Sequence, residues 1–169
     1  MAADLYSVAT GGTIGALSGF LSNFLIEYLK SKKIAKHLAQ SFLGEIKALR
    51  TITEARGYID ELKQLIAQVE KSNEPILYQV KVRKDYLVIY KENAARIGMF
   101  EEPLPEYLAT FYTLTNSIFE DLESLSDGTF SDRSPQSLLK CYKEMLTLFE
   151  GASAYGEKII DIIKNKYCN

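Results

Sequence analysis

With 169 residues, the chain can form one ordinary hydrophobic core and one additional short segment. Hydrophobic residues make up 47% of it, and one apolar segment near the N-terminus contributes strongly to that share. A net charge of −2 argues against a nucleic-acid-binding protein, because such proteins carry a large basic excess. Two distant cysteines, Cys141 and Cys168, indicate neither a disulfide framework nor a zinc site.

The first predicted element is a transmembrane anchor within residues 1–29. Residues 5–26 form a stretch of 22 residues without a charge, about the length needed to cross a hydrocarbon core of roughly 30 Å. Asp4 precedes this stretch and lysines follow it, which is the reverse of a cleaved signal peptide. Ten of the 22 residues are Gly, Ser, Thr or Asn, so the span is polar for a helix that crosses lipid alone.

A group of lysines follows the anchor and predicts its orientation. No Lys or Arg precedes the apolar stretch, whereas four lysines come soon after it: Lys30, Lys32, Lys33 and Lys36. By the positive-inside rule, we expect the N-terminus outside the inner (plasma) membrane and the C-terminal domain in the cytoplasm. These lysines are expected to lie at the membrane surface beside anionic headgroups; the alternative is a solvated helix face.

Small residues inside the anchor recur every fourth position, at Gly11, Gly15 and Gly19, and Asn23 continues the row. On a helix they share one face, where a second helix can approach to backbone contact. This register predicts a homo-oligomer that associates through its anchors. A simple packing anchor and a water-lined pore are the alternatives.

Next, apolar residues at three- and four-residue steps predict a long amphipathic helix over 34–69, which can continue from the anchor. Gly44 and Gly57 can bend this helix, and residues 72–75 end it. Residues 76–83 alternate as a strand does, but the sequence offers no second strand to pair with them. We therefore expect an extended segment there.

Three further helices are predicted in the C-terminal half. The first runs from about residue 84 to 97, with Gly98 as its C-terminal cap, and a turn follows it. The second begins near Pro105 and stops at 126–128, and the third starts at Pro135 after a Ser134 cap. The predicted fold is all-α: one N-terminal transmembrane helix followed by a four-helix cytoplasmic bundle over residues 30–169.

Catalytic motifs are missing from the sequence. The only glycine pair, Gly11–Gly12, has no lysine nearby, which argues against a phosphate-binding loop. His37 is the single histidine and lies among lysines, so a metal site or a Cys/His nucleophile is not expected. We expect a protein that is not an enzyme and uses no cofactor.

One stretch is a candidate pocket for a small ligand or a cytoplasmic protein partner. Tyr90 and Asn93 share a helix face, Arg96 is placed to pair with Glu92, and Tyr112 follows on the next helix. The alternative interpretation is a polar network inside the core with an ion pair on the surface.

The order of the anchor, the lysines, Gly44-Glu45-Ile46-x-x-Leu49, Tyr90-x-x-Asn93-x-x-x-Ile97-Gly98 and Phe111-Tyr112 resembles a group of small uncharacterised bacterial inner-membrane proteins. The layout is also similar to membrane-anchored HEPN-like accessory proteins of RNA-targeting CRISPR systems. That similarity implies an oligomeric membrane pore. Helical HEPN ribonucleases need an Arg four to six residues before a His, and no Arg precedes His37.

The sequence thus favours a non-enzymatic membrane protein that self-associates, as an oligomeric pore or a membrane-perturbing effector in bacterial antiviral defence. A monomeric, membrane-tethered scaffold or sensor that binds a cytoplasmic partner is the alternative. Nucleic acid is not an expected partner.

Overall fold

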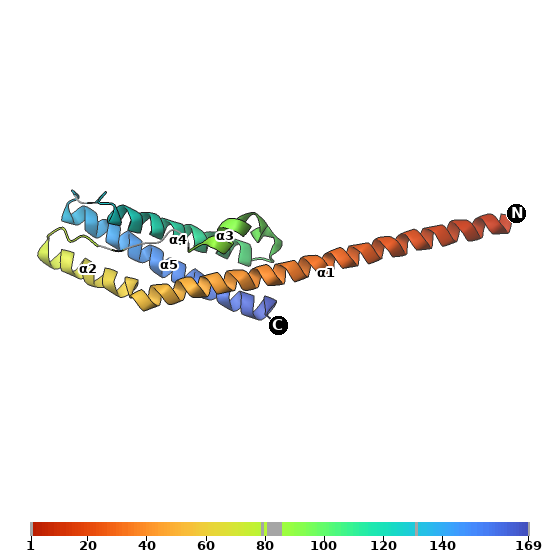
Figure 1. Cartoon of the computed structure of the whole chain (residues 1–169), viewed down its shortest axis with the longest axis horizontal. Coiled ribbons are helices and arrows are strands. Elements are labelled where there is room, and N and C mark those ends of the chain that lie inside the picture. Colours follow the sequence, from red (N-terminus) through yellow and green to blue (C-terminus); the bar gives the residue numbers. More distant parts are fainter. Residues whose placement is uncertain (1, 79, 81–85, 131, 169) are drawn as a thin grey trace. The chain divides into compact units, whose positions relative to one another are not determined.

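The computed structural model describes the backbone of residues 2–78, 80, 86–130 and 132–168, and the side chains among these from Ser22 onward. Its elements are α1 (Ala2–Arg56), α2 (Tyr58–Ser72), α3 (Val88–Asn93), the 3-10 helix η1 (Ala94–Met99), α4 (Leu104–Ser126) and α5 (Pro135–Tyr167) (Figure 1). The described residues contain no strand. The prediction of an all-helical fold is confirmed.

The chain divides into two compact units, residues 1–38 and residues 39–169, and α1 contributes to both. The second unit is a helical bundle, as predicted. Within the described part of the chain, no helix is both long enough and apolar enough to cross a membrane.

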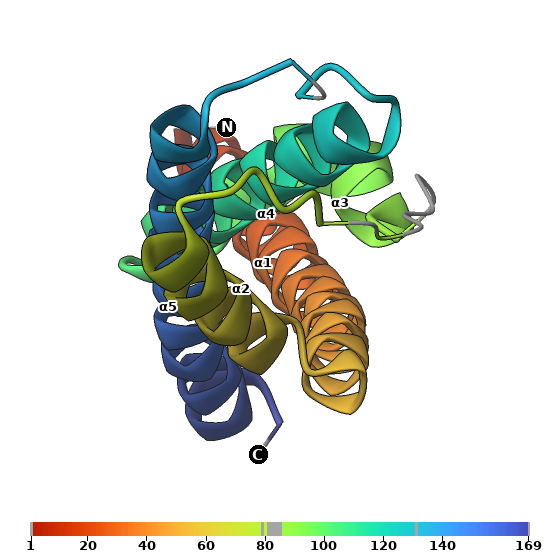
Figure 2. The same ribbon diagram turned by 90° about the vertical axis from the view of Figure 1, so that its left-hand side faces the viewer.

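The chain bends at Gly57, between α1 and α2 of the bundle. Gly57 has a φ of +65°, a left-handed conformation that glycine adopts without strain, and it separates α1 from α2. The chain bends there without reversing, so α2 runs on beyond the end of α1 and packs along α5 (Figures 1 and 2). Gly44, the other glycine predicted to bend the chain, lies inside the uninterrupted helix.

The helix predicted near residues 84–97 differs most from expectation. Its described part consists of six residues of α3 followed by six of η1, and Gly98 lies inside η1 and does not cap it. The long helix predicted over 34–69 is in turn divided by Gly57. The bundle therefore contains the end of α1, α2, α4 and α5 as its longer helices, with α3 and η1 as short additions.

Helices α4 and α5 form the most closely packed pair and run antiparallel (Figure 1). Their ends follow the sequence signals. Pro105 lies in the first turn of α4, and Ser126 is its last residue. The Ser134 hydroxyl caps α5 by accepting a hydrogen bond from the Ser137 amide at 3.3 Å.

The core of the bundle draws on every long helix. Phe42 and Ile46 come from α1, and α2 adds a stripe of four buried residues. The remaining fully buried large side chains lie mainly on α4 and α5: Leu104, Leu108, Tyr112, Leu122, Leu138, Tyr142, Met145 and Ile159. Burial of these side chains is the dominant stabilising contribution to the fold.

Candidate functional site

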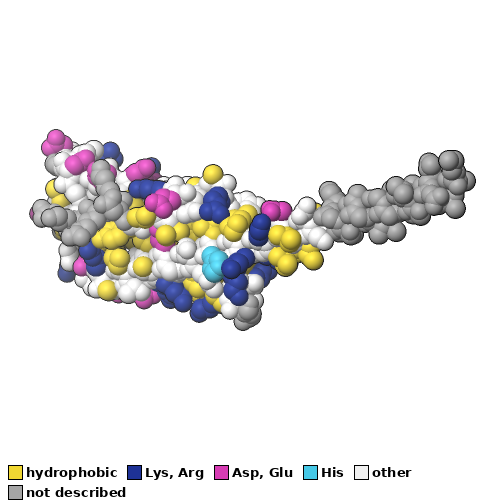
Figure 3. Space-filling model, turned by 45° about the vertical axis from the view of Figure 1, so that its right-hand side comes forward, with side chains coloured by type: hydrophobic (Ala, Val, Ile, Leu, Met, Phe, Trp, Pro, Cys, Tyr) yellow, Lys and Arg dark blue, Asp and Glu magenta, His cyan; other side chains and the backbone are white. Residues whose placement is uncertain are grey.

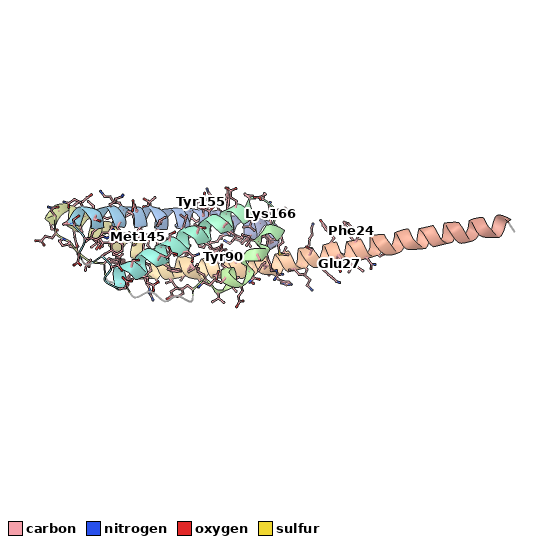
Figure 4. The ribbon with its side chains drawn as sticks, turned by 90° about the horizontal axis from the view of Figure 1, so that it is seen from above. Phe24, Glu27, Tyr90, Met145, Tyr155 and Lys166 are labelled. Atoms are coloured by element: carbon pink, nitrogen blue, oxygen red, sulfur yellow. The ribbon has the colours of Figure 1, made fainter. Side chains whose placement is uncertain are left out.

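Exposed apolar side chains cover the described start of α1. Phe24 is 65% exposed, and four other large apolar residues on the next turn and a half are about half exposed: Leu25, Ile26, Tyr28 and Leu29. We call these five residues the apolar belt. Figure 4 labels Phe24, whose side chain projects from the helix, and Figure 3 shows apolar side chains gathered beside lysines. Exposed patches of this kind mark sites of interaction.

The belt covers more of the helix circumference than one packing face. At 3.6 residues per turn, Phe24, Leu25 and Ile26 together with the next turn span an arc of about 200°. A helix that packs on one neighbour needs an apolar stripe only about 100° wide. A single flat protein surface would therefore leave part of the belt uncovered.

The predicted membrane-surface lysines follow the belt directly. Lys30 pairs with Glu27 at 3.2 Å, and the Lys32 ammonium lies 4.8 Å from the centre of the Tyr28 ring. Lys33 is exposed and Lys36 is half-buried. Exposed ion pairs of this kind contribute little to stability, so these cations can interact with an external partner at small cost.

The predicted association stripe lies mainly outside the described side chains. Gly11, Gly15 and Gly19 belong to the part of α1 of which only the backbone is described. Asn23 is described, and its side chain is exposed. Association through this stripe stays a prediction.

The second predicted group centres on a residue that the sequence analysis gave no role, Glu45 of α1. One carboxylate oxygen, Oε1, accepts a hydrogen bond from the Ile89 amide at 2.6 Å. The other, Oε2, accepts from the Tyr90 amide at 3.2 Å and from the Tyr112 hydroxyl at 2.6 Å. The carboxylate thus caps the N-terminus of α3, where no neighbouring side chain does so.

Tyr90 and Tyr112 both donate hydrogen bonds to this carboxylate and also contact each other. Their rings stack with centroids 4.0 Å apart and planes 13° from parallel, and Tyr112 is completely buried. Burial, and then the hydrogen bond to Glu45, raise the pKa of the Tyr112 phenol. Tyr112 therefore stays protonated and donates to the carboxylate.

The other two residues of the group complete a local network. The Asn93 amide donates to the Ile89 carbonyl at 3.0 Å, and the Arg96 guanidinium donates to the Asn93 side-chain oxygen at 3.3 Å. The ion pair expected between Arg96 and Glu92 is not formed in this described stretch. The structure thus brings Tyr90, Asn93, Arg96 and Tyr112 together; a ligand or partner pocket at these residues stays a prediction.

Glu45 shows what sequence reasoning missed and why. It lies on the face of α1 that also carries the buried Phe42 and Ile46. A charged residue beside a buried stripe signals a partner elsewhere in the fold, since even a partly buried charge needs compensation. The partners are 44 to 67 residues away in the chain, and helical spacing carries no information on them.

Two other side chains with raised pKa values, Tyr78 and Cys141, do not form a catalytic arrangement. Burial, with a hydrogen bond from its hydroxyl to Glu61, raises the pKa of Tyr78. Burial also raises the pKa of the Cys141 thiol to about 11, which makes it a poor nucleophile at neutral pH. No group of His, Cys, Asp and Glu among the described side chains could hold a metal ion.

Comparison with known proteins adds no relative: no family model, no curated protein and no solved structure matches the chain.

Proposed function

We propose that the chain is a non-enzymatic protein that attaches to a membrane through its first helix and associates with copies of itself there. The observation that carries the proposal is the apolar belt, which is exposed and wider than the apolar stripe of a helix that packs on one neighbour. A lipid surface can take up apolar side chains from an arc of this width. The same residue types at an aqueous surface would favour aggregation.

The lysines that follow the belt support attachment at a membrane of anionic lipid. Lys30, Lys32 and Lys33 lie within one turn of the last belt residue and are exposed. Each cation near an anionic surface contributes about 1 kcal/mol to binding. Apolar insertion and cation attraction together give firmer attachment than either alone.

Self-association rests on the glycine register of the sequence. Gly11, Gly15 and Gly19 fall on one face of the helical stretch that precedes the belt, and Asn23 extends this face to the belt itself. Close approach of two such helices brings their backbones into van der Waals contact. An oligomer of anchors would place several bundles on the same side of the membrane.

Crosslinking of the full chain in native membranes tests self-association. We expect a ladder of dimers and higher species, and Gly15→Ile should remove it, because a β-branched side chain separates the two helices. Ala16→Ile changes a neighbouring position outside the register and serves as the matched control. A chain that crosslinks only as a monomer, or a ladder that Gly15→Ile leaves unchanged, contradicts the proposal.

A further inference from the structure

An apolar cavity of about 110 Å³ lies in the bundle and is lined by residues other than those of the Glu45 network. Its walls come from the end of α1, the start of α2, the middle of α4 and the middle of α5. The lining includes the rings of Phe111, Phe119 and Phe149. It also includes the aliphatic side chains of Ile46 and Ile118.

Small residues on α5 leave this space open. The run of residues 151–156, GASAYG, provides three of the lining residues, Ala152, Ser153 and Gly156. A Cβ atom at Gly156 would lie 3.3 Å from the Phe111 ring and 3.6 Å from Ile46, so the wall is tight at that point. At position 152 the short alanine side chain lines the cavity.

The walls favour an aromatic occupant. Two pairs of rings line the cavity, Tyr86 with Phe119 and Tyr58 with Phe149, at centroid distances of 6.0 and 5.9 Å. The two rings of each pair are tilted relative to each other by 34° and 39°, so the cavity is lined by rings in more than one orientation. An additional ring gains from edge-to-face contacts with such walls.

The polar groups at the cavity are already paired within the chain, which disfavours a charged ligand. The Thr115 hydroxyl donates to the Phe111 carbonyl at 2.8 Å, and no buried side-chain nitrogen or oxygen among the described residues lacks a partner. Arg50 at the rim already pairs with Glu54 at 2.6 Å and with Glu157 at 3.2 Å. A charged molecule would have to break these pairs, whereas a neutral one would not.

We infer that this cavity is a binding site for a neutral molecule with a single aromatic ring. An engineered apolar cavity of about 150 Å³ in another protein stays dry and takes up benzene. The present cavity is somewhat smaller, but three exposed lining residues, Arg50, Glu54 and Ser153, give it a mouth through which a ring can enter. This inference does not depend on the proposed attachment to a membrane.

Benzene is the probe that tests this inference. The full-length chain, with its Ile and Leu methyl groups labelled with ¹³C, is titrated with benzene in one fixed detergent. We expect chemical shift changes at the cavity residues Ile46, Ile118 and Leu122. The buried residues Leu62 and Ile163 do not line the cavity and should not respond.

Variants distinguish the cavity from general partitioning of benzene. Ala152→Leu fills the cavity and Ser153→Leu covers its mouth, and each should abolish the response of the cavity methyl groups. Ala154→Leu makes the same change at an exposed position of α5 and should leave the response intact. If Ala152→Leu fails to fold, Ser153→Leu, at an exposed position, carries the test. A missing response in the original chain, or the same response in all variants, overturns the inference.

Discussion

Phe24 and Phe42 lie on the same helix, yet the first is 65% exposed and the second is completely buried. The Phe42 ring packs against Phe100 and Tyr112, with centroid distances of 6.0 and 5.9 Å. An apolar residue on a helix thus has no fixed role: Phe42 stabilises the bundle because α4 and the segment before it supply partners. Phe24 and the rest of the belt lack such partners among the described residues, and their apolar surface stays exposed.

The largest expected effect is a difference in stability between these two positions. Phe42→Ala should lower the free energy of unfolding by about 3–5 kcal/mol, because it removes a buried ring and leaves a cavity. Phe24→Ala should change it by less than about 0.5 kcal/mol, as exposed substitutions usually do. Chemical denaturation of the full chain, followed by circular dichroism, measures both. Equal losses would mean that the belt belongs to the folded core.

The Glu45 network gives the next largest effect. Glu45→Ala should destabilise the bundle by about 3 kcal/mol, because it removes hydrogen bonds to a charged group and leaves two amides of α3 without a cap. Tyr112→Phe removes one of the three bonds and should cost about 1.5 kcal/mol. Hydrogen exchange should also quicken at Ile89 and Tyr90 in Glu45→Ala, and unchanged exchange there would count against the capping role.

A pH dependence follows from the raised pKa of Tyr112. Above about pH 10 the unfolded chain loses the phenolic proton and the folded chain keeps it, so the unfolded state is favoured increasingly as the pH rises. Below that pH, Tyr112 should not make the free energy of unfolding depend on pH. Above it, Tyr112 should lower the free energy of unfolding by up to about 1.4 kcal/mol per pH unit. Denaturation at pH 9 and pH 11 should show a smaller loss in Tyr112→Phe than in the original chain. An identical loss in both would contradict the assignment.

The smallest expected effects come from two glycines of opposite role. Gly57→Ala should destabilise the bundle by about 1 kcal/mol, because its φ of +65° strains any residue with a Cβ. Gly44→Ala should stabilise it by up to about 1 kcal/mol, since Gly44 is helical and exposed, with free space around its Cβ position. Thermal unfolding of the two variants checks the signs. If both variants change the thermal stability in the same direction, the different roles assigned to Gly57 and Gly44 are wrong.

Several features of the bundle could be predicted from local signals in the sequence. The start of α5 is marked by Ser134 and Pro135, and the end of α4 by Ser126. Such signals can be recognised in the sequence because caps and helix breakers act within one turn. The choice between Gly44 and Gly57 as the bend could not be made, since both are glycines in one amphipathic pattern. The structure bends at Gly57, after which α2 packs along α5.

The short length of α3 and the cavity depend on contacts across the fold. The N-terminus of α3 is capped by Glu45, a residue on another helix, and its continuation as η1 accompanies packing on α4. The cavity arises because Ala152 and Gly156 face rings from α4. Helical spacing shows that these positions share a face, but it does not show how much space lies in front of them.

Partition of the full chain between membrane and aqueous fractions tests the central claim most directly. After cell lysis and ultracentrifugation, we expect the chain in the membrane pellet, resistant to extraction with alkaline carbonate. The combined variant Phe24→Ser, Leu25→Ser and Ile26→Ser should weaken this retention without unfolding the bundle. Recovery of the unaltered chain in the supernatant, as a folded monomer, would contradict the proposal that the apolar belt meets lipid.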